Sequence, residues 1–113
     1  MTSAHDVVSN NRIERAERVA DELAKIGIED PTISHRAQET INGQTVPYSQ
    51  VYAGGSFDND RPAAEDRRDE VKNVISTGSA YIHTSTPNPE LNGVTHNLVI
   101  VKISEGVTSG DEQ

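Results

Sequence analysis

An Asn–Gly dipeptide at positions 42 and 43 places the strongest constraint on how this chain folds. It lies between two stretches of strand-like sequence, and Asn–Gly is the preferred dipeptide of two-residue hairpin turns. A turn of this kind fixes the register of the hairpin and pairs Ile41 with Gln44, Glu39 with Val46, Ala37 with Tyr48, and Ile33 with Tyr52. The sequence therefore predicts an antiparallel hairpin around this turn.

The register divides the hairpin side chains between two faces. One face is mostly apolar, and we expect it to join the core; it holds Ile33, Ala37, Ile41, Val46, Tyr48 and Tyr52. The other face is expected to meet water or a polar partner; it holds Thr32, Ser34, Arg36, Gln38, Thr40, Thr45, Pro47 and Ser49. Pro47 lacks an N–H group, which predicts that the second strand is an edge or is bulged there.

A helix is predicted to precede the hairpin. Asn11 and Glu14 have the spacing of a capping pair, and Gly27 is typical of a left-handed helix end with Ile28 folding back on Leu23. The spacing of apolar residues predicts a narrow buried stripe of Ile13, Ala16, Ala20, Leu23 and Ala24. We expect this stripe to pack on a sheet.

The second half of the chain repeats the order of helix and strands. Asp60, Arg61 and Pro62 predict the start of a helix that runs to about Thr77 and ends at Gly78. Strands are expected at 79–86 and 94–104, and the apolar run 98–101 is typical of a central strand buried on both faces. The predicted fold class is α+β, in the order α-β-β-α-β-β, with a mixed or antiparallel sheet of about four strands and two helices packed on it.

The chain is poor in large apolar residues. Leu, Ile, Val and Phe together make up 24 of 113 residues, so the core is expected to be small. We expect one domain at 11–104, a flexible arm at 1–10 and an acidic tail at 105–113. No apolar run approaches the roughly 18 residues that span a bilayer, and no secretory signal is expected. A thin core of this kind is often stabilised by a partner or by further copies of the chain.

Acidic residues dominate the charge. Eighteen Asp and Glu oppose ten Lys and Arg, for a net charge of −8, and only three of the bases are Lys. This charge repels phosphates, so direct nucleic-acid binding is not expected. An acidic, Lys-poor composition resembles that of proteins from salt-loving organisms, and ordinary acidic solubility explains it equally well. The absence of cysteine excludes disulfides and thiolate chemistry.

Catalytic and metal-binding motifs are weak. His35, His83 and His96 could form a metal site with Glu39 or Glu90, but the spacing favours hydrogen-bonded histidines in a sheet. No nucleophile elbow or phosphate-binding motif is present, and no cofactor is expected. The loop 53–60 contains Gly54-Gly55 and Phe57, and this Phe is either tucked under the loop or presented to a partner. Its carboxylates suit capping of the following helix better than calcium binding.

The better candidate for function is an interaction surface. The polar hairpin face carries a single charge and resembles a wet subunit interface. The interface candidates, drawn from this face and from the loop 53–60, are Arg36, Gln38, Thr40, Thr45, Phe57, Asp58 and Asp60.

Three segments resemble the small α+β proteins that form rings at the neck or tail end of tailed viruses, the tail-completion and tail-terminator group. They are the helix RIERAERVADELAKIG, the extended stretch through VPYSQVYAGG, and the charged helix PAAEDRRDEVKNVIS. The resemblance covers most of 11–104 and implies a non-enzymatic ring subunit that joins the capsid connector to the tail. It implies no functional residue.

We therefore expect a structural assembly subunit, not an enzyme. Its partners would be copies of itself and other virion or assembly proteins, and its place the virion, or the host cytoplasm before assembly. The alternatives are an acidic regulatory binding module, such as an inhibitor or an antitoxin-like protein, and a small metal-dependent enzyme.

Overall fold

The protein is an antiparallel sheet of four strands with two helices on one face, described here from a computed structural model for residues 10–86 and 93–104. The elements are α1 (Asn10–Ala24), β1 (Ile33–Ile41), β2 (Gln44–Tyr52), α2 (Arg61–Val74), β3 (Ser79–Ser85) and β4 (His96–Ser104). The strand order is β1-β2-β4-β3, and every neighbouring pair is antiparallel. The predicted α+β class and element order are confirmed.

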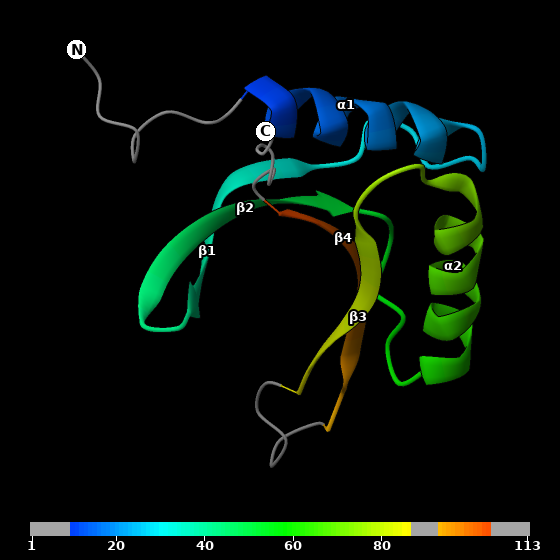
Figure 1. Cartoon of the computed structure of the whole chain (residues 1–113). Coiled ribbons are helices and arrows are strands. Elements are labelled where there is room, and N and C mark those ends of the chain that lie inside the picture. Colours follow the sequence, from blue (N-terminus) through cyan, green and yellow to red (C-terminus); the bar gives the residue numbers. More distant parts are fainter. Residues whose placement is uncertain (1–9, 87–92, 105–113) are drawn as a thin grey trace.

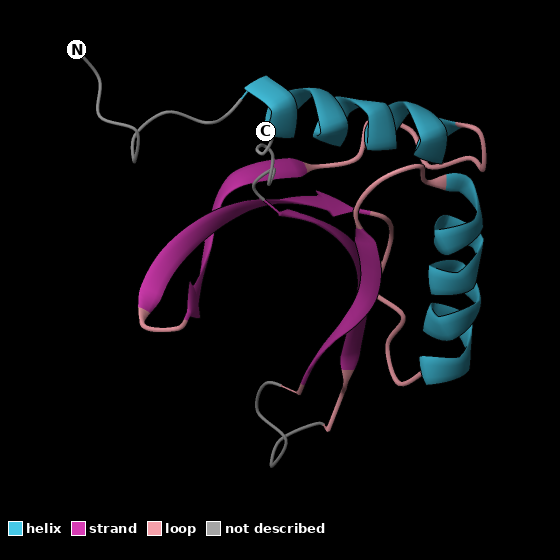
Figure 2. Ribbon diagram, viewed as in Figure 1, coloured by secondary structure: helices cyan, strands magenta, loops and turns pink. Residues whose placement is uncertain are grey.

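Both helices lie on the outer side of a strongly curved sheet, so the sheet has a convex face under the helices and a concave face away from them (Figures 1 and 2). The core lies between the helices and the convex face. Its fully buried members are mostly small, and they are Ala16, Val19, Leu23, Val51, Ala53, Ala64, Val71, Val99, Val101 and Ile103. One layer of helices is all that the described residues place on the sheet.

The structure confirms the predicted end of the first helix and corrects two other predicted helix boundaries. Gly27 has a φ of +88°, and the Ile28 N–H donates to the Leu23 carbonyl at 3.0 Å, which confirms the predicted ending of the first helix. The second helix ends at Val74, three residues before the predicted end, because Ile75 has extended backbone. Asn11 lies inside α1 and does not cap it, since the helix already includes Asn10.

The buried stripe of α1 differs from the predicted one. The residues that face the sheet are Arg12, Ala16, Val19 and Leu23, whereas Ala24 is exposed and Ile13 is half-buried. The reason is Arg12, which is 1% exposed. Its guanidinium Nη1 donates to the His35 carbonyl and to the Ser49 hydroxyl, each at 3.1 Å. A charged residue at the first position of a buried stripe is invisible to a pattern of apolar spacing.

The Asn42–Gly43 turn confirms the predicted hairpin. Both residues have positive φ, at 53° and 80°, as a type I′ turn requires. The predicted pairs hold from Ile41–Gln44 to Ala37–Tyr48, but Ile33 pairs with Val51 and not with Tyr52. An irregularity between Ser34 and Ala37 shifts the register by one residue, as a β-bulge does.

The predicted faces of the hairpin are wrong in orientation. Ser49 and Val51, both 0% exposed, face the helices, so Tyr48 and Tyr52 point to the opposite, concave side. Of the predicted core face, only Ile33 packs against the core: the bulge in β1 separates it from Ala37, which lies on the concave side opposite Tyr48. The bulge thus separates the two ends of one strand onto different faces.

The last two strands confirm most of their predictions. β4 is central, between β2 and β3, and Val99, Ile100 and Val101 are buried, while Leu98 is half-buried. Pro47 lies one residue beyond the last β2–β4 pair, so β2 is an edge there among the described residues, as predicted. The predicted arm and tail at 1–9 and 105–113 lie outside the described residues, and Asn10 belongs to α1. No helix within the described ranges has the length and apolarity needed to cross a membrane.

The buried Arg12 generates a testable prediction. Replacing Arg12 with Ala should lower the free energy of unfolding by about 3 kcal/mol, because it removes buried volume and the hydrogen bonds to the Ser49 hydroxyl and the His35 carbonyl. Arg18→Ala on the exposed side of α1 is the control and should change it by less than about 0.5 kcal/mol. Urea unfolding measures both, and equal effects would contradict the proposed anchoring of α1.

Candidate interaction surface

The described helices leave the concave face of the sheet uncovered (Figure 2). Successive side chains of a strand point to opposite faces, so the residues before and after each buried convex residue point to the concave face. We use "concave face" for the set Tyr48, Gln50, Tyr52, Tyr81, Leu98, Ile100 and Lys102. Ile100 is 3% exposed although no described helix covers it, because larger neighbours surround it. The face therefore has an apolar centre with amphipathic side chains around it.

All three tyrosines of the chain lie on the concave face. Gln50 links two of them: its Nε2 donates to the Tyr81 hydroxyl at 3.1 Å, and the Tyr52 hydroxyl donates to its Oε1 at 3.2 Å. The first hydrogen bond links β2 to β3 across the central strand β4, and the second lies within β2, so Tyr52 and Tyr81 are held in place before any partner arrives. Tyrosines held in this way present apolar area at a low cost in conformational entropy.

The charges on the concave face neutralise each other. The Lys102 ammonium forms an ion pair with Glu39, and it lies 4.8 Å from the centre of the Tyr48 ring. Glu39 is the one carboxylate found in any of the four strands, although the chain has 18 acidic residues. A partner thus meets an aromatic and aliphatic surface without net charge, which is the composition typical of the centre of protein interfaces.

The polar residues predicted as interface candidates lie on the opposite side of the hairpin from the concave face. Gln38, Thr40 and Thr45 are exposed on the side that continues the convex face, beyond the reach of α1. Arg36 is exposed within the bulge. The structure brings these four together on the hairpin but separates them from the loop 53–60.

The loop residues have structural contacts of their own. Phe57 is tucked against the core, and the Arg67 guanidinium lies 5.9 Å from its ring centre, which decides between the two predicted placements. Its carbonyl accepts a hydrogen bond from the Asn97 amide at 2.8 Å. Asp60 caps α2 by accepting from the Ala63 N–H at 3.2 Å, as predicted.

Asp58 belongs to a small exposed cluster with Ser56 and His96. The Ser56 hydroxyl donates to Asp58 Oδ1 at 2.6 Å, and His96 Nδ1 lies 2.8 Å from the same oxygen and 3.1 Å from the hydroxyl. The hydrogen bonds from Ser56 and then from His96 lower the pKa of the Asp58 carboxyl. Ser56 and Asp58 share one ring nitrogen, so this cluster lacks the two-nitrogen relay of a Ser-His-Asp triad.

The histidines are dispersed. His35 Nδ1 lies 2.7 Å from the Ser49 hydroxyl beneath α1, whereas His83 is exposed on β3. The register places His83 opposite Leu98 and His96 opposite Ser85, so these two share a face on a diagonal. Within the described ranges, no three His, Asp or Glu residues are grouped to hold a metal ion. Glu90, the other predicted metal ligand, lies outside those ranges.

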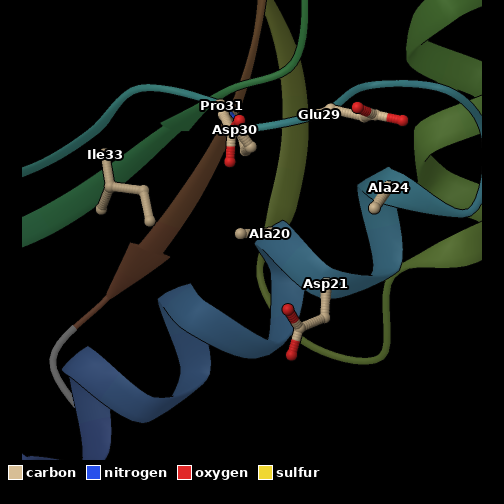
Figure 3. A pocket seen from close by; sticks show the side chains of 7 residues that line it. All are labelled: Ala20, Asp21, Ala24, Glu29, Asp30, Pro31 and Ile33. Atoms are coloured by element: carbon tan, nitrogen blue, oxygen red, sulfur yellow. The ribbon is translucent and has the colours of Figure 1, made fainter.

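A shallow hollow of about 410 Å³ lies between α1 and the start of β1 (Figure 3). Its floor is made of small apolar groups, and its rim carries three carboxylates: it is lined by Ala20, Asp21, Ala24, Glu29, Asp30, Pro31 and Ile33. The hollow contains no nucleophile or base in a catalytic arrangement.

Comparison with protein-family models, with curated proteins and with solved structures finds no match.

Sequence reasoning missed three residues of the concave face, Gln50, Tyr81 and Lys102. It placed Tyr48 and Tyr52 in the core, since their spacing of four puts them on one face of a strand. The residue type itself indicates a different position for these side chains. In a chain with one Phe and no Trp, three tyrosines indicate a face that is partly wet.

The Asp58 cluster yields a prediction for an NMR titration. Ser56→Ala should raise the pKa of the Asp58 carboxyl, because the first of its two hydrogen bonds is lost. In the native protein, the hydrogen bonds of the ionised Asp58 stabilise the fold because they lower its pKa. This stabilisation is present above the pKa of an ordinary carboxyl and is lost as the pH falls through the pKa of Asp58 in the folded protein. Ser79→Ala, an exposed serine at the other end of β3, is the control. An unchanged Asp58 titration in Ser56→Ala would contradict the assignment.

Proposed function

We propose that this protein is a non-enzymatic structural subunit that assembles with copies of itself through the concave face of its sheet. The observation that carries the proposal is the uncovered concave face itself, where Tyr52 and Tyr81, both hydrogen-bonded to Gln50, lie on either side of the buried Ile100. With helices on one face alone, the three tyrosines and Leu98 remain half-buried on the other face, and a further layer from another molecule would remove the rest of their surface from water.

The distribution of charge supports self-association through this face. Copies of a chain with a net charge of −8 repel each other, and the repulsion is strongest where carboxylates meet. The four strands carry a single carboxylate, paired with Lys102, so contact through the sheet avoids this repulsion. The helices and the connecting segments, which carry the other described acids, then remain in water.

The resemblance to tail-completion and tail-terminator proteins supports a more specific form of the proposal. In that form the assembly is a ring at the neck or tail end of a tailed virus, and other virion proteins are its further partners. The Lys-poor composition extends the proposal to a virus of a salt-loving host, where strong salt screens the acids and strengthens apolar contacts.

The hollow of Figure 3 favours a second candidate, an acidic regulatory binding module. Asp21, Glu29 and Asp30 surround an apolar floor, a combination that suits the stem and head of a Lys or Arg side chain from a basic partner. A one-to-one complex with such a partner, formed by a chain that is monomeric by itself, distinguishes this candidate from self-assembly.

The proposal predicts the mass of the protein in solution. Light scattering behind a sizing column, at low and at multimolar salt, should give a closed oligomer in at least one condition. Tyr81→Asp should raise the concentration needed for half-assembly by at least about tenfold, because a buried charge faces the apolar centre of the interface.

The matched control is Asn73→Asp, which adds the same charge on the exposed side of α2 and should leave assembly unchanged. A wild-type monomer in both salt conditions would contradict the proposed function, and so would equal effects of the two variants.

A further inference from the structure

Half of the β1–β2 hairpin extends beyond the four-stranded sheet. The last pair between β2 and β4 is Tyr48–Ser104, so residues 37–41 and 44–47 have no third strand among the described residues. We call residues 37–47 the ribbon. Figure 1 shows the ribbon projecting from the sheet, away from α2. A two-stranded hairpin without further support is marginally stable in water, so a projecting ribbon gains stability when another surface packs on it.

The tip of the ribbon carries an apolar side chain in an uncharged setting. Ile41, 47% exposed, is the single large hydrophobic residue classed as exposed in the described part of the chain. It lies directly before the turn, opposite Gln44. The one charged side chain of the ribbon is Glu39, which is already paired with Lys102. In a strongly acidic chain, the ribbon thus has the chemistry of a contact surface.

The shape of the concave face limits what can cover it. The sheet curves toward its uncovered side (Figure 2), so a flat surface cannot lie along the whole face, whereas a narrow two-stranded ribbon can enter the curve. The concave face offers the Tyr52 and Tyr81 rings beside the apolar side chain of Ile100. It is uncharged overall, as the ribbon is. The chain therefore contains both a projecting apolar tip and an uncovered concave surface of matching chemistry.

We infer that the ribbon of one copy docks on the concave face of the next copy, with Ile41 placed against the tyrosines. This inference rests on the proposed self-assembly and specifies its geometry. Each copy uses two different surfaces, so the contact is head-to-tail. Contacts of this type close into a ring when the rotation per subunit permits and otherwise continue into a filament. The carboxylates of α1 and α2 stay outside the contact.

Two single variants separate the two surfaces. Ile41→Asp places a charge at the tip of the ribbon, on a residue that is exposed. Tyr81→Asp places the same charge on the concave face, where the Tyr81 hydroxyl is hydrogen-bonded to Gln50. Each variant alone should be monomeric at concentrations where the wild type and Asn73→Asp assemble, with a rise in the half-assembly concentration of at least about tenfold. Circular dichroism checks that both variants keep the fold.

Mixing the two variants is the decisive step. Tyr81→Asp retains an intact ribbon and Ile41→Asp retains an intact concave face, so an equimolar mixture should form a one-to-one heterodimer and nothing larger. Light scattering of the mixture gives this mass directly, and heterodimer formation also shows that both variants are folded. A mixture that stays monomeric would overturn the head-to-tail geometry.

The remaining outcomes separate this inference from the proposed function. If the wild type and Ile41→Asp assemble equally well, the ribbon does not cover the concave face. The inference is then wrong, but the proposed self-assembly still holds. If the wild type is monomeric at every concentration and salt, both proposals fail. If a chain ending at Ser104 assembles while the full chain does not, the segment 105–113 occupies the face and the inference is overturned.

Discussion

The packing of both helices against the convex face of the sheet determines the rest of this structure. The core that forms there is built largely from Ala and Val, with Leu23 and Ile103 as its largest apolar members. Arg12 completes it: a buried guanidinium joins α1 to the β1 backbone and to Ser49 of β2. Such anchoring orients a helix whose apolar stripe is too narrow to fix its rotation by packing alone. With both helices on the convex face, the concave face has no described cover.

Uncovered apolar surface and charge distribution lead to the same functional conclusion. The strands carry all three tyrosines and a single carboxylate, whereas the other described carboxylates lie on the helices and loops. Asp and Glu are uncommon in strands in general, and here the one strand carboxylate, Glu39, is also paired with Lys102. The separation makes physical sense when that face meets another molecule and the rest of the surface remains in water.

Local signals in the sequence predicted most of the fold. The Asn42–Gly43 turn, the left-handed end at Gly27 and the Asp60 cap each depend on neighbouring residues alone, and each lies where it was expected. The faces of the hairpin were not predictable in this way. A bulge between Ser34 and Ala37 places the two ends of β1 on different faces, and its position depends on how β1 pairs over its whole length. The buried Arg12 was hidden for a related reason, because its partners come from other elements.

An intermolecular relaxation experiment tests most directly whether another copy covers the concave face. The chain has no cysteine, so a spin label on Thr45→Cys reports from the ribbon alone. It is mixed with an isotope-labelled copy that carries no spin label, under conditions where the wild type assembles. The account predicts that broadening in the isotope-labelled copy centres on Tyr52, Tyr81 and Ile100. Broadening centred on α1 or α2 instead, or no intermolecular broadening in the assembled state, would contradict it.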